Sequence, residues 1–68
     1  MKQVSGRELA RVVQQRGWRL ARVHGSHYIF TMRNRRERLV VPIHGNRPLK
    51  TGLLRSLMKI ARLTESDL

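Results

Sequence analysis

Gly17 separates two hydrophobic periods, and this change constrains the fold more than any other feature of the chain. Before it, Leu9, Val12 and Val13 recur at the spacing of one helix face. After it, residues 18–24 alternate between apolar and polar side chains, which is typical of a strand. Glycine often ends a helix in the left-handed conformation. The sequence therefore predicts a helix that ends at Gly17 and a strand that follows it.

The start of this helix is marked as well. Ser5 is a preferred N-cap residue, and Glu8 stands three residues later, which is the pattern of a capping box. Val4 and Leu9 have the spacing of a hydrophobic staple around that cap. We therefore expect the first helix to be capped by Ser5.

Two further segments, 27–32 and 38–44, are predicted to be strands. The turn His24-Gly25-Ser26 precedes the first of them, and the charged segment 33–37 is expected to be an exposed loop. Pro42 has no amide hydrogen, so it fits an edge strand or a strand end. Segment 27–32 is apolar on both sides, which leaves open whether Tyr28, Phe30 and Met32 or instead Ile29 faces the core.

A second helix follows the turn 45–48, because apolar residues cluster at helical spacing between residues 53 and 61. Pro48 and Thr51 are both plausible starting points, and Thr64 is expected to cap one more turn near the end. The order helix, three strands, helix predicts an α+β fold in which two helices cover one face of an antiparallel sheet. The length predicts a single domain over residues 1–68.

The net charge of +11 is the strongest signal of composition, since 15 Lys and Arg face only four Asp and Glu. Twelve of these cations are arginine, whose planar guanidinium suits phosphate groups. Such an excess opposes a compact fold by self-repulsion, so we expect a polyanion or an acidic partner. The sequence shows neither a signal peptide nor an apolar run of membrane-spanning length, and a cytoplasmic protein is expected.

Several chemistries are disfavoured by the residues present. The four acidic residues form no evidently convergent pair of the kind that glycoside hydrolysis needs. There is no cysteine, and the histidines His24, His27 and His44 lack the spacing of a metal site, so neither a metal nor a cofactor is expected. Ser26 follows a glycine and is typical of a turn rather than of a nucleophile.

A histidine that works with arginines on RNA remains as a candidate chemistry. Imidazole can take up and release a proton near neutral pH. RNA carries its own nucleophile, the 2′-hydroxyl, whose attack on the adjacent phosphorus gives a 2′,3′-cyclic phosphate and a free 5′-hydroxyl. Cations can stabilise the charge that develops on the phosphate oxygens. This reaction requires no metal ion.

Four segments in order resemble the HicA toxins of bacterial type II toxin–antitoxin systems. Residues 5–18 are similar to the opening helix of that family, and residues 22–30 contain its Arg-x-x-Gly-Ser-His signature. Residues 39–44 resemble its Val-Pro-x-His strand, and residues 49–61 its closing helix. The resemblance covers most of the chain. It departs from the family pattern at Thr51-Gly52, where members often have Gly-Thr, which leaves the helix start open.

The resemblance implies a small endoribonuclease that cleaves messenger RNA, with a fold related to double-stranded-RNA-binding domains. It implies that His27 is the catalytic residue and that a cognate HicB antitoxin binds the toxin and masks its active site. From the residues themselves, Gly25 and Ser26 are expected to hold the hairpin that presents His27. Gly25 and Ser26, together with Arg22 and Lys50, are the candidates for substrate binding, Arg22 and Lys50 through phosphate contacts. Arg22 has the alternative role of a solvated strand residue.

The roles of His44 and of the aromatic residues each have two interpretations. His44 is a candidate second proton carrier or support, or it caps a strand end. Trp18, Tyr28 and Phe30 could stack on bases, although packing in so small a core is the expected role. At the level of function, the alternatives are a non-catalytic RNA-binding module of the same fold and a degenerate toxin that retains only antitoxin binding.

Overall fold

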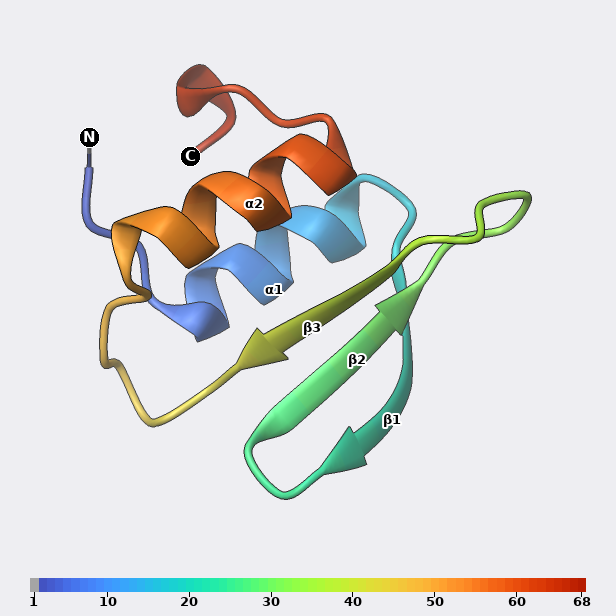
Figure 1. The fold of residues 1–68 in the computed structure, drawn as a ribbon, viewed down its shortest axis with the longest axis horizontal. Coiled ribbons are helices and arrows are strands. Elements are labelled where there is room, and N and C mark those ends of the chain that lie inside the picture. The colour runs from blue at the N-terminus through green and yellow to red at the C-terminus, as the bar shows by residue number, and fades with distance from the viewer. Residues whose placement is uncertain (1) are drawn as a thin grey trace.

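The first helix, α1 (Gly6–Gln15), has the ends that the sequence predicts in the computed structural model, which describes residues 2–68 (Figure 1). The Ser5 hydroxyl accepts a hydrogen bond from the Glu8 amide, and the Glu8 carboxylate accepts one from the Ser5 amide, both at 3.1 Å. This reciprocal pair confirms the capping box. Gly17 has a φ of +100°, which glycine adopts without steric cost, and the chain turns there into the sheet.

Three strands follow: β1 (Arg19–His24), β2 (His27–Thr31) and β3 (Arg38–Pro42). They form one antiparallel sheet in the order β1-β2-β3. The strands are shorter than predicted, because residues 18, 32, 43 and 44 lie outside them. Pro42 meets both expectations for a proline, since it ends β3 and β3 is an edge strand.

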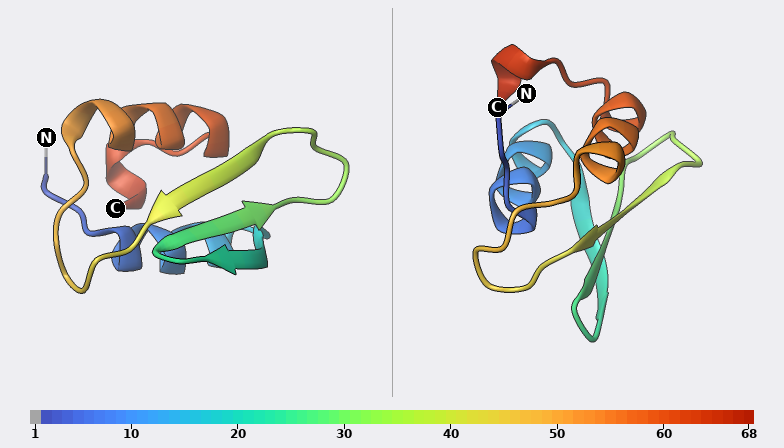
Figure 2. Two further views of the ribbon diagram at one scale, coloured as in Figure 1. Left: turned by 60° about the horizontal axis from the view of Figure 1, so that its bottom comes forward. Right: turned by 60° about the vertical axis from the view of Figure 1, so that its left-hand side comes forward.

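The two faces of the sheet differ in what covers them. Phe30 of β2 is buried together with Leu39 and Val41 of β3, and both helices contact β3 (Figures 1 and 2). Tyr28 lies on the same face as Phe30, because side chains alternate along a strand. This resolves the ambiguity in β2, since Ile29 faces away from the helices.

The second helix, α2 (Thr51–Ala61), begins at the later of the two starting points that the sequence allows. Lys50 occupies the N-cap without a side-chain hydrogen bond to the helix, and Arg62 ends the helix in the left-handed region with a φ of 58°. A 3₁₀ turn, η1 (Glu65–Asp67), follows Thr64 as predicted.

The sheet and its helices confirm the predicted α+β class over the described part of the chain. Ser5 forms a bridge with Pro48, and the Leu49 amide donates to the Val4 carbonyl at 2.8 Å, so the segments that enter the two helices lie side by side. None of the helices within residues 2–68 has both the length and the apolar character needed to cross a membrane.

Candidate functional site

The hairpin between β1 and β2 determines where His27 lies. His24 and His27 pair across the two-residue turn Gly25-Ser26. Gly25 has a φ of +62°, whereas Ser26 is not among the non-glycine residues with positive φ, which matches a type II′ turn with glycine at its first position. The Ser26 carbonyl accepts a hydrogen bond from the Ile43 amide at 2.9 Å. The turn is thereby tied to the residue that follows β3, and His27 emerges directly beside it.

His27 belongs to the face of the sheet that the helices leave uncovered, which we call the open face. In the register of the sheet, His27 lies between His24 of β1 and Pro42 of β3. Residues directly opposite one another in antiparallel strands project on the same side. The open face therefore consists of three rows across the sheet: His24, His27 and Pro42; Arg22, Ile29 and Val40; and Arg19, Thr31 and Arg38.

Both histidines of the first row are accessible. Each is exposed, and within residues 2–68 neither imidazole makes a hydrogen bond or an ion pair with the protein. Their ring nitrogens are therefore available to solvent or to a bound molecule. This exposure meets the first geometric requirement for a proton-transfer residue, which must reach the group it acts on.

Arg22, one of the two residues predicted to contact phosphate, lies on the open face together with His27. It pairs with Ile29, which is two residues beyond His27 on β2, so Arg22 occupies the neighbouring row. Residues in such diagonal positions lie about 7–8 Å apart, within reach of a long side chain. The structure thus brings Arg22 and His27 together.

Lys50 and His44 lie together in a cleft beside Pro42. They line a cleft of about 280 Å³ whose wall also includes Pro42 and Leu53. Because Pro42 is the β3 partner of His27, this cleft adjoins the first row of the open face. His44 follows the end of β3 in an irregular segment, so no strand fixes its side chain in that row.

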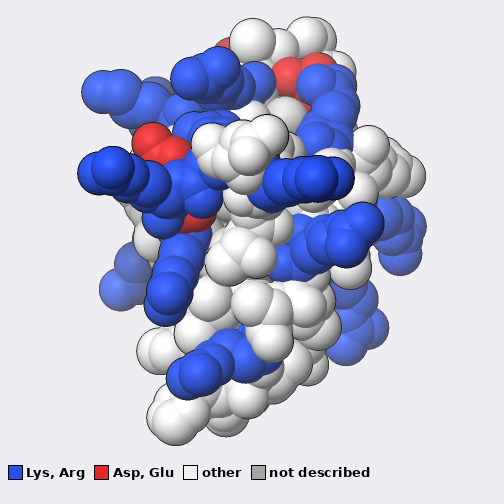
Figure 3. Space-filling model, turned by 90° about the vertical axis from the view of Figure 1, so that its right-hand side faces the viewer, with Lys and Arg blue, Asp and Glu red and all other residues white. Residues whose placement is uncertain are grey.

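A second basic region lies at the opposite end of the open face. Arg16, Arg19 and Arg33 line a cleft of about 570 Å³ together with Thr31 and two neighbouring residues. Thr31 is four residues from His27 on β2, which corresponds to about 13 Å along a strand. On the side of the molecule shown in Figure 3, Lys and Arg side chains far outnumber Asp and Glu and gather over the upper and middle part of the view, whereas the lower part is mainly uncharged.

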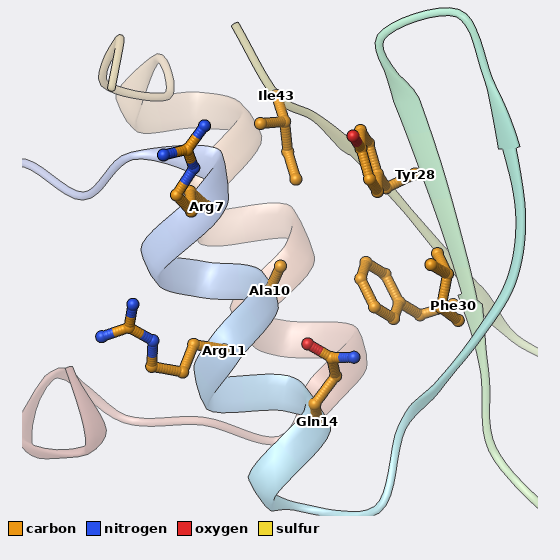
Figure 4. A pocket seen from close by; sticks show the side chains of 8 residues that line it. Arg7, Ala10, Arg11, Gln14, Tyr28, Phe30 and Ile43 are labelled. Carbon is orange, nitrogen blue, oxygen red and sulfur yellow. The ribbon is translucent and has the colours of Figure 1, made fainter. Parts of the chain in front are cut away.

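The three aromatic residues lie away from the open face. Trp18 and Phe30 are buried in the core, each only 1% exposed, as packing residues. Tyr28 is half-buried and lines a groove of about 300 Å³ between α1 and the hairpin. Figure 4 shows Tyr28, Phe30 and Ile43 on the sheet side of this groove. The structure favours packing as the role of Trp18 and Phe30 and leaves Tyr28 accessible.

Three of the four acidic residues have local hydrogen-bonding partners. The Ser5 backbone amide lowers the pKa of Glu8, and the Thr64 backbone amide lowers that of Asp67. The pKa of Glu37 is lowered by its own backbone amide and then by an arginine in the same loop. None of these acids belongs to the rows of the open face, and no three His, Asp or Glu residues gather at one point within residues 2–68.

The structure adds residues that sequence reasoning did not assign to the site. The sequence predicts only a turn position for His24 and gives it no metal-site spacing, yet His24 is the cross-strand neighbour of His27. The signal was present, because residues that flank a two-residue hairpin turn necessarily pair. No sequence motif marks Arg19 and Arg33, and their proximity depends on how β1 and the β2–β3 loop fold.

Comparison with known proteins covers the same elements. A family model described as the HicA toxin of bacterial toxin–antitoxin systems matches residues 6–63, which include both helices, the whole sheet and the candidate site. A search of curated proteins finds no match. The family match spans well over half of the chain, and this protein therefore belongs to the HicA toxin family of bacterial toxin–antitoxin systems.

Proposed function

We propose that this toxin is an endoribonuclease that cleaves messenger RNA without a metal ion and uses His27 to transfer a proton. The observation that carries the proposal is the exposed position of His27 on the open face, with Arg22 in the neighbouring row. A proton carrier and a phosphate-binding cation thus share one accessible surface. The family assignment supports a toxin with a cognate antitoxin, and the ribonuclease activity is the further step proposed.

The reaction uses groups that RNA and the chain supply. The 2′-hydroxyl loses its proton, its oxygen bonds to phosphorus, and the bond from phosphorus to the 5′-oxygen breaks. The 5′-oxygen takes up a proton, so the products are a 2′,3′-cyclic phosphate and a 5′-hydroxyl. His27 carries one of these two protons as general base or general acid, a role that commonly contributes about 10²–10⁴-fold to the rate.

Cations around the first row account for binding. Arg22 is proposed to contact the phosphate that is cleaved or its neighbour, where guanidinium hydrogen bonds stabilise the developing negative charge. Lys50 is proposed to hold a second phosphate in the cleft beside Pro42, with His44 as a support in the same cleft. Gly25 and Ser26 are proposed to contribute by fixing the backbone on which His27 stands.

The same surface suits the antitoxin. Family membership implies a cognate antitoxin, and a HicB-type protein that covers the open face would block access to His27. The net charge of +11 favours an acidic partner surface, because complementary charge speeds association and selects partners.

The test is cleavage of RNA by the purified protein in excess EDTA. We expect the parent to cut a single-stranded RNA and to leave the DNA strand of the same sequence intact, because DNA lacks the 2′-hydroxyl. His27→Ala should lose about 10²–10⁴-fold in rate and retain most of its RNA affinity. His44→Ala is the matched control and should lose less activity than His27→Ala.

Three results would contradict the proposal. Loss of cleavage on addition of EDTA would exclude the metal-free mechanism. Equal rates for the parent and His27→Ala would remove His27 as the proton carrier. RNA binding without cleavage by the parent would instead support the non-catalytic RNA-binding module.

A further inference from the structure

We propose that His24 is a second catalytic residue and that His24 and His27 divide the two proton transfers between them. One imidazole takes the proton of the 2′-hydroxyl, and the other gives a proton to the departing 5′-oxygen. This inference rests on the proposed ribonuclease function and names the second proton carrier that the function requires.

The geometry comes from the register of the hairpin. His24 and His27 are Cα partners across the turn, so their side chains start from the same face of the sheet. The Cβ atoms of such opposite residues are about 4.5–5.5 Å apart. Two imidazoles anchored at that separation can stand on either side of one phosphate group. Both are exposed and free of protein partners within residues 2–68.

The chemistry requires two groups at once. In an in-line displacement, the attacking and leaving oxygens lie on opposite sides of phosphorus. A single imidazole that accepts the proton of the attacking oxygen lies on one side of phosphorus. It is therefore on the wrong side to give a proton to the leaving oxygen. With two imidazoles, one ring is neutral and the other protonated before the reaction. Their protonation states are reversed afterwards, and exchange with water restores them.

Other side chains near the first row are less suited to this role. Arg22 shares the open face, but arginine stays protonated in proteins and cannot act as a proton donor in turnover. His44 lies in an irregular segment beyond the end of β3, so no strand register places it directly opposite His27. Pro42, the neighbour of His27 on β3, carries no titratable group. His24 is the titratable side chain directly opposite His27.

The experiment compares two RNA substrates of the same sequence. One has an ordinary linkage at the cleaved position, and the other has sulfur in place of the bridging 5′-oxygen. A thiolate is a far better leaving group than an alkoxide and departs without a proton donor. The thio linkage therefore restores the rate of a variant that lacks the general acid and does not restore one that lacks the general base.

We expect His24→Ala and His27→Ala each to cut ordinary RNA about 10²–10⁴-fold more slowly than the parent. The thio linkage should restore most of the rate for one of these two variants and not for the other. His24→Gln should behave as His24→Ala does, because it retains a polar side chain but carries no titratable proton. Far-UV circular dichroism and thermal unfolding should match those of the parent, since His24 is exposed.

The outcomes separate this inference from the proposed function. If the parent does not cleave RNA in EDTA, the proposed function fails. If the parent cleaves and His24→Ala is equally fast, the inference about His24 alone is overturned. The inference would also be overturned if both variants cut ordinary RNA slowly and the thio linkage restored the rate of neither variant or of both. A residue that merely positions RNA affects the cleavage of the two linkages alike.

Discussion

Replacing Gly6 with alanine tests how closely α1 approaches the end of β3. Gly6 is the first residue of α1 and is buried. A Cβ atom added there would lie 2.1 Å from the Pro42 carbonyl oxygen and 3.2 Å from Cγ1 of Ile43. The nearer obstacle is backbone of the strand residue that pairs with His27. It cannot move aside by a change of rotamer, so the helix or the strand must shift by almost 1 Å.

The expected cost is the difference between two opposing effects. Overpacking of a closely packed site costs about 1–3 kcal/mol. Alanine lowers the conformational entropy of the unfolded chain and favours the helix, which offsets up to about 1 kcal/mol. We expect Gly6→Ala to lower the free energy of unfolding by about 1–2 kcal/mol. For a domain of this size, each kcal/mol shifts Tm by roughly 4–8 °C.

Gly52→Ala is the matched control. Gly52 lies in the first turn of α2, is exposed, and has no atom within 4 Å of the position of an added Cβ. Here only the lower conformational entropy of the unfolded chain acts, and the free energy of unfolding of the variant should rise by about 0.4–1 kcal/mol. Urea and thermal unfolding followed by circular dichroism measure both changes. A Gly6→Ala protein as stable as the parent would refute the close approach of α1 to β3.

Two further perturbations address charge. The Ser5 amide lowers the pKa of Glu8 in the folded state. The contribution of Glu8 to stability is therefore present at neutral pH and is lost as the pH falls below about 4.3 and through the folded pKa. Glu8→Gln retains the capping geometry and should reduce this acid dependence of the unfolding free energy in unfolding titrations. Arg19→Gln and Arg33→Gln should each weaken RNA binding and lower the slope of log K against log salt by about 0.7 for every lost single-strand phosphate contact. Lys59→Gln, an exposed change on α2, is the control, and an equal effect there would show that only net charge matters.

Local signals in the sequence predict the elements well because the causes are local. The capping box needs only Ser5 and Glu8 at the correct spacing, and it forms as expected. Gly17 and Pro42 act through their own backbone restrictions, and each stands where those restrictions are satisfied. The second helix had two plausible starts, and the sequence did not choose between them. Its N-cap, Lys50, makes no side-chain bond that would mark the start.

The faces of the sheet could not be predicted, because they depend on packing between distant segments. β2 is apolar on both sides, and the burial of Phe30 against the helices decides its orientation. In β1 the register shifts between Leu20 and Arg22, as in a β-bulge. Simple alternation would place Arg19 and Arg22 on opposite faces, since they are three residues apart. The bulge places both on the open face.

The candidate site shows the same division. The Gly-Ser-His signature singles out His27, and Arg22 lies beside it because it stands two residues before His24 in the regular part of the hairpin; the irregular register of β1 instead decides that Arg19 shares this face. The gathering of His44 and Lys50 in one cleft follows from the path of the segment between β3 and α2. The pairing of His24 with His27 and the place of Arg22 in the next row are predictable, since a two-residue turn and regular pairing alone require them.

The absence of aromatic rings from the paired rows of the open face has a consequence for how RNA would be held. Proteins that bind single strands without sequence preference usually combine phosphate contacts with bases stacked on aromatic rings. Here Phe30 is buried, and Tyr28 faces the groove beside α1 rather than the open face. The open face carries cations, histidines and small or aliphatic side chains. RNA bound there would be held mainly through its phosphates, so we expect affinity to fall steeply with salt and to vary little with base sequence. Strong base selection by the isolated protein would therefore point to the groove with Tyr28 as a second contact surface.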